Sequence, residues 1–76
     1  MERKTLAQLR AQKGLTQREL APALGITPSA LAMYEIGLRT PYLKKAKEIA
    51  AYFGVPVEQI IFGPEVKTIK TGTTGD

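Results

Sequence analysis

Cysteine and histidine are both absent from the 76 residues of this sequence. Their absence excludes disulfide bonds, thiolate or imidazole ligands for a metal ion, and most pairs of a nucleophile with a general base. No apolar run approaches the roughly 20 residues that a membrane-spanning helix needs, and the N-terminus leads into a helical pattern without an apolar signal segment. These absences predict a cytoplasmic protein with no membrane partner, no metal and no cofactor.

The chain has room for one domain with a modest core, because chains of this size bury only about 60% of the surface that they expose when unfolded. Apolar residues make up 43% of the sequence and charged residues 24%, an ordinary balance for a folded domain. Eleven lysines and arginines outnumber seven acidic residues, which gives a net charge of +4. This excess favours an anionic partner such as nucleic acid, although many small basic proteins bind no anion specifically.

Five glycines divide the sequence into blocks with apolar residues at helical spacing, and glycine just past a helix supplies the left-handed residue that ends it. They are Gly14, Gly25, Gly37, Gly54 and Gly63. The pattern predicts an all-α domain over residues 1–63, with a first helix from about Thr5 to Lys13 and a short fifth one between Pro56 and Phe62. Residues 64–76 are expected to be a disordered tail, with a short strand at residues 66–69 as the alternative.

The middle helices carry clear start signals. Thr16 followed three residues later by Glu19 is a capping box, in which each side chain bonds to the other residue's backbone N–H. Threonine–proline pairs at 27–28 and 40–41 combine a capping hydroxyl with a proline in the first turn, and they predict the starts of the third and fourth helices. Pro22 falls within the second helix, where it removes one hydrogen bond and predicts a kink.

Residues 17–36 meet the requirements of two helices joined by a tight turn. Ala21 is small where the second helix must approach the third closely, and Gly25 permits the sharp turn of the backbone between them. The apolar residues expected to lock the two helices together are Leu20, Leu24, Ile26 and Leu31.

The sequence resembles the phage-repressor class of helix-turn-helix proteins, known as the Cro/CI-like family. The resemblance covers Leu6 to about Gly63 and rests on Gly14-Leu15-Thr16-Gln17-Arg18-Glu19-Leu20-Ala21, Leu24-Gly25-Ile26-Thr27, Tyr34-Glu35-Ile36-Gly37 and Arg39-Thr40-Pro41. It implies a five-helix, lambda-repressor-like bundle that binds a pseudo-palindromic double-stranded DNA operator as a homodimer. The implied function is that of a sequence-specific transcriptional regulator, with repression as the expected effect.

By position, the resemblance makes the helix that begins at Thr27 the recognition helix, which enters the major groove, and Thr27 itself is expected to contact DNA. Its side chains expected at base edges are Pro28, Ser29, Ala32 and Met33. The residues expected at phosphates are Gln17, Arg18, Arg39, Lys44 and Lys45, with Tyr42 and Lys47 as undecided candidates. The resemblance also pairs Arg10 with Glu35 as a partly buried ion pair, which we interpret as structural because burying one partner alone would be costly.

The expected reading face carries no Arg, Lys, Gln or Asn, the side chains that make bidentate contacts with guanine or adenine. Ser29 can hydrogen-bond to several bases, whereas Ala32 and Met33 can pack on thymine methyl groups. We therefore expect modest direct readout of a T-containing half-site, with DNA shape supplying the rest. Ile36 replaces a polar residue that meets a phosphate in the family, and Pro56 replaces a capping serine or threonine.

The apolar reading face supports a second function, a protein-interaction module that kept the helical fold and lost DNA binding. An enzyme is the weakest of the three classes, because the carboxylates are scattered over separate helices, and so short a chain shows no evident small-molecule site. Dimerisation has separate support from an apolar C-terminal end richer than a short helix needs for its own packing. The residues of that end are Val55, Val57, Ile60, Ile61 and Phe62.

Overall fold

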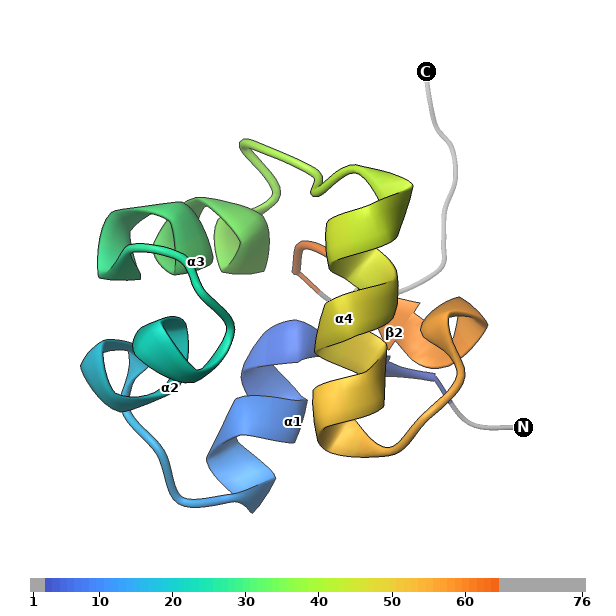
Figure 1. Ribbon diagram of the computed structural model, residues 1–76, viewed down its shortest axis with the longest axis horizontal. Helices are drawn as coiled ribbons and strands as arrows, with labels where there is room; N and C mark the ends of the chain where they lie inside the picture. Colours follow the sequence, from blue (N-terminus) through green and yellow to red (C-terminus); the bar gives the residue numbers. More distant parts are fainter. Residues whose placement is uncertain (1–2, 65–76) are drawn as a thin grey trace.

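The computed structural model describes residues 3–64, which form mainly helices (Figure 1). Within that range the α-helices are α1 (Leu6–Gln12), α2 (Gln17–Ala23), α3 (Pro28–Ile36) and α4 (Leu43–Phe53). A 3-10 turn, η1 (Val57–Gln59), and two short strands, β1 (Lys4–Thr5) and β2 (Ile60–Ile61), complete it. The mostly helical class is confirmed. Nearly all of the expected tail, including the alternative strand at 66–69, lies outside the described residues.

Of the predicted fifth helix, only the 3-10 turn η1 is found. After η1 the backbone of Ile60 becomes extended (φ −97°, ψ 129°), and β2 pairs in parallel with β1 at the other end of the described chain. In this pairing Lys4 lies opposite Ile60 and Thr5 lies opposite Ile61. Two adjacent β-branched residues favour the extended backbone, and the pairing buries Ile60 while supplying its backbone with hydrogen-bond partners.

The cap predictions are confirmed for two of the three middle helices. In the capping box of α2, the Glu19 N–H donates to Thr16 Oγ1 at 3.1 Å and the Thr16 N–H donates to Glu19 Oε1 at 2.8 Å. The Ala30 N–H donates to Thr27 Oγ1 at 3.1 Å and so caps α3. The expected start of the fourth helix is wrong, because α4 begins after an extended Tyr42 that makes no side-chain cap, and Pro41 is buried in the preceding loop.

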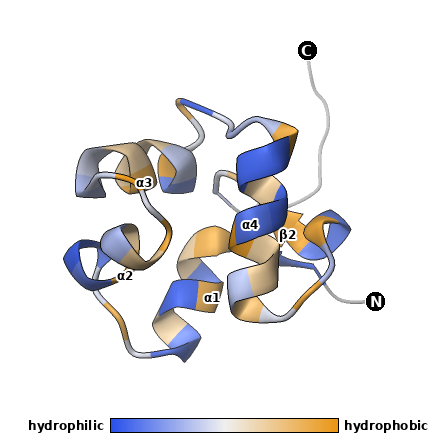
Figure 2. Ribbon diagram, in the orientation of Figure 1, coloured by the Kyte–Doolittle hydropathy of each residue, from blue (hydrophilic) through white to orange (hydrophobic). Residues whose placement is uncertain are grey.

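The core lies where α1, the α2–α3 pair and α4 meet (Figures 1 and 2). Its fully buried large side chains are Leu6, Leu20, Leu31 and Ile49, one from each helix. The predicted burial of Leu24 is also found, and Ile26 packs against the core as a partly buried residue. In Figure 2 hydrophobic colouring appears on α1, α4 and β2 where these elements lie close together.

The apolar C-terminal end serves the protomer's own core. Ile60 is buried in the core, and Val55, Val57 and Phe62 pack against it as partly buried residues. Most of the apolar residues at this end therefore pack within the core of one chain. A dimer would therefore have to form through a different surface.

The junction between α2 and α3 has the form that the sequence predicts. Ala21 is fully buried between the helices, and Gly25 adopts the left-handed backbone (φ +71°) that the turn requires. Helix α2 continues through Pro22, which is exposed, and ends one residue later. Among residues 3–64, no helix is long and apolar enough to cross a membrane.

Candidate nucleic-acid interface

Helix α3 lies at the outer edge of the bundle and packs against α2 through its inner side (Figure 1). The residues that α3 turns inward are Leu31 and Glu35, both buried. Pro28 and Ser29 are exposed, which leaves the first turn of α3 open to solvent. Ala32 and Met33 are half-buried, so their outward surface is smaller than the sequence suggests. The first turn is therefore the most accessible part of the expected reading face.

The end of α3 is closed by converging backbone hydrogen bonds. The N–H groups of Gly37, Leu38 and Arg39 all donate to the carbonyl oxygen of Met33. Gly37 has a left-handed backbone (φ +84°). A Cβ atom at this position would also lie only 3.3 Å from Pro64 Cδ, which is a tight contact. These hydrogen bonds end α3 at a turn of the backbone, and Arg39 in that turn is exposed.

Three of the predicted phosphate-binding cations are exposed. Arg18 lies on α2, Arg39 lies in the loop after α3, and Lys44 lies in the first turn of α4. The first turn of α4 contains no acidic residue, so its backbone N–H groups and Lys44 present positive charge together. These cations come from the elements on either side of α3 in the sequence.

Lys45 differs from its neighbour Lys44. Its Nζ donates to the carbonyl oxygen of Leu24 at 2.9 Å, and it lies 2.9 Å from Glu48 Oε1. The hydrogen bond from Lys45 holds the pKa of Glu48 below its ordinary value. In this arrangement Lys45 ties α4 to the end of α2, so its contact with phosphate stays a prediction that requires these bonds to open.

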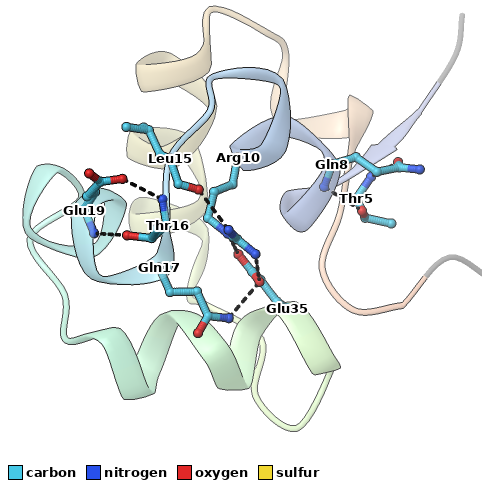
Figure 3. Close-up of polar contacts among 8 residues, drawn as sticks. All are labelled: Thr5, Gln8, Arg10, Leu15, Thr16, Gln17, Glu19 and Glu35. Carbon is cyan, nitrogen blue, oxygen red and sulfur yellow. Dashed lines mark hydrogen bonds and ion pairs between the residues drawn. The ribbon is translucent and has the colours of Figure 1, made fainter.

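The structure brings Arg10 and Glu35 together as a two-pronged ion pair (Figure 3). Arg10 Nε donates to Glu35 Oε2 at 2.7 Å, and Arg10 Nη2 donates to Glu35 Oε1 at 3.1 Å. The remaining nitrogen, Nη1, donates to the carbonyl oxygen of Leu15 at 2.9 Å. The hydrogen bond to Glu35 raises the pKa of Arg10 above its ordinary value. One guanidinium thus joins α1, the loop before α2, and α3.

Gln17 lies in the same cluster, which its sequence position does not reveal. Its Nε2 donates to Glu35 Oε1 at 2.9 Å, so Glu35 accepts hydrogen bonds from two helices at once (Figure 3). Gln17 is half-buried and bridges the start of α2 to the end of α3. Its predicted phosphate contact therefore requires either the second N–H of the Gln17 amide or the loss of the hydrogen bond to Glu35.

An exposed helix held against a second helix by a tight glycine turn is the arrangement of the helix-turn-helix class of DNA-binding domains, and exposed cations on the neighbouring elements suit a phosphate backbone. A family model described as helix-turn-helix matches residues 6–60. The chain therefore belongs to the Cro/CI-type helix-turn-helix family of transcriptional regulators, which are DNA-binding proteins and not enzymes.

Curated relatives share this segment. The HTH-type transcriptional activator BcrR of Enterococcus faecalis is 34% identical over 64 residues, or 84% of this chain and 31% of the activator. The cryptic phage CTXphi transcriptional repressor RstR of Vibrio cholerae is 28% identical over 60 residues, or 79% of this chain and 54% of the repressor. An uncharacterised HTH-type regulator of Methanocaldococcus jannaschii is 42% identical over 55 residues, or 72% of this chain and 83% of that protein.

The chain spans about a third of the activator and about half of the repressor. No solved structure matches the chain.

Proposed function

We propose that this chain binds a double-stranded DNA operator as a homodimer, with α3 in the major groove, and represses transcription. The observation that supports this most directly is the open first turn of α3, at Pro28 and Ser29, together with the exposure of Arg18, Arg39 and Lys44 on the segments before and after α3. Side chains at the start of a recognition helix reach base edges, whereas cations on its flanks bind phosphates. Repression requires only that the operator be occupied, and RstR is a named repressor with the same segment.

The dependence of DNA affinity on salt tests this function. Three exposed cations in each protomer of a dimer give six phosphate contacts. Affinity for duplex DNA should then fall about a thousandfold between roughly 50 and 200 mM salt, because each contact releases condensed counterions. Fluorescence anisotropy with a labelled duplex measures this slope. A flat salt dependence, or no binding in dilute buffer, would instead support the protein-interaction module as the function.

Dimerisation is proposed through the apolar surface at the α3–α4 junction. Its exposed side chains are Ile36, Leu38, Tyr42 and Leu43. Leu38 is 73% exposed and Tyr42 is 90% exposed, so a second copy would remove much apolar surface from water. To reach two half-sites on one face of the duplex, the two α3 helices of such a dimer must lie about 34 Å apart.

Sedimentation without DNA tests the dimer surface. The unaltered chain should sediment as a dimer at micromolar concentration, and Leu38→Glu should weaken self-association at least about tenfold, because it places two carboxylates in an apolar contact. The matched control is Ala51→Glu, which changes the net charge equally at an exposed position on α4. A monomeric unaltered chain would contradict the dimer, and equal behaviour of the two variants would contradict the proposed surface.

A further inference from the structure

A pocket of about 260 Å³ opens where β1, the ends of α1 and α4, and η1 meet. The residues that line it are Lys4, Leu9, Gln12, Lys13, Phe53, Val55 and Gln59. In Figure 1 the ends of α1 and α4 lie at the bottom of the molecule, whereas α3 lies at the upper left. The pocket is therefore separate from the first turn of α3, and it was not expected from so short a sequence.

The lining of the pocket contains both apolar and polar residues. Leu9 is buried in the core, and Phe53 and Val55 pack against the core as partly buried residues. The other lining residues are two lysines and two glutamines, and none of the seven is acidic. A ligand with an apolar body and a negatively charged end would match this lining, since the apolar residues desolvate the body and the Lys13 side chain attracts the charge.

One of these lysines, Lys13, also contacts an aromatic ring next to the pocket lining. Lys13 Nζ lies 5.5 Å from the centroid of the Tyr52 ring, within the range of a cation–π interaction. Tyr52 in turn meets Phe53 edge to face, with ring centroids 5.1 Å apart and planes at 89°. Because Phe53 also lines the pocket, these contacts favour a position of the Lys13 ammonium near the apolar lining residues.

We propose that this pocket binds a small aromatic carboxylate, with the ring on Leu9, Phe53 and Val55 and the carboxylate at Lys13. Pockets for drug-sized ligands have volumes of about 300–1,000 Å³. A pocket of 260 Å³ is slightly smaller and therefore suits a ligand smaller than a typical drug. A single ring with a short acidic arm fits such a space, whereas a folded peptide segment does not. The amide of Gln12, another lining residue, can donate a further hydrogen bond to the carboxylate.

Titration of the full chain with three probes tests the ligand class, with backbone amide resonances followed by NMR. Phenylacetate should shift the resonances of the lining residues in a saturable manner at millimolar concentration. Phenylacetamide, which has the same ring without the charge, should bind about tenfold more weakly. Acetate, which has the charge without the ring, should produce no saturable shift. Equal affinity for phenylacetate and phenylacetamide, or shifts confined to residues away from the pocket, would overturn the proposal.

A pair of lysine variants tests the role of Lys13. Lys13→Gln should weaken phenylacetate binding about threefold to fivefold, because it removes one partly exposed charge interaction, and should leave phenylacetamide binding unchanged. The matched control, Lys47→Gln, makes the same exchange at an exposed position of α4 that does not line the pocket, and it should leave both affinities unchanged. Equal effects of the two variants on phenylacetate would overturn the assignment of the carboxylate to Lys13.

Discussion

Replacement of Arg10 by methionine should lower the free energy of unfolding by about 3–5 kcal/mol, because it leaves the carboxylate of Glu35 buried without its counterion. The Glu35 side chain is only 5% exposed, and after the replacement it would keep one of its described side-chain partners, the amide of Gln17. The carbonyl oxygen of Leu15 would also lose its donor. Since small domains have total stabilities of about 5–15 kcal/mol, this single change should remove a large part of the total.

Thermal and urea unfolding followed by circular dichroism measure this effect. Arg18→Met is the matched control, because it makes the same exchange at an exposed position of α2 and should change the stability little. A double variant, Arg10→Met with Glu35→Leu, should be more stable than Arg10→Met alone, since it removes the buried charge as well. Equal melting temperatures for Arg10→Met and Arg18→Met would show that the ion pair does not hold the helices together.

The helices and their caps can be predicted from the sequence because their causes are local. Thr16 and Glu19 are three residues apart, and so are Thr27 and its bonding partner Ala30, so the relevant atoms meet as soon as one turn forms. The end of the domain has a non-local cause. Ile60 pairs in its extended conformation with Lys4, at the other end of the described chain. Residues 56–62 alone do not identify that pairing partner.

The same distinction separates the predicted from the unpredicted parts of the interface. The exposure of Ser29 on α3 follows from helical spacing once Leu31 is known to be buried. The hydrogen bonds of Gln17 to Glu35 and of Lys45 to the carbonyl of Leu24 join different helices. They depend on the distance between packed elements, which hydrophobic periodicity does not specify.

Ser29→Glu should reduce affinity for operator DNA by about a hundredfold or more, because it places a carboxylate on the exposed first turn of α3, close to the phosphates on both sides of the groove. The folded state itself should tolerate the change. A negative charge near the N-terminus of α3 interacts favourably with the helix dipole, and the Thr27 cap remains in place. Anisotropy with a labelled duplex measures the affinity, and circular dichroism checks that the variant keeps its melting temperature.

Ala51→Glu separates a local effect on α3 from the general effect of net charge. It lowers the net charge by the same amount at an exposed position on α4, outside the proposed interface. Because exposed charges beyond a Debye length are screened at physiological salt, this control should lose no more than about threefold in affinity. If the two variants lost affinity equally, α3 would not be the element that enters the groove. If Ser29→Glu bound as tightly as the unaltered chain, the groove-facing role of that first turn would be wrong.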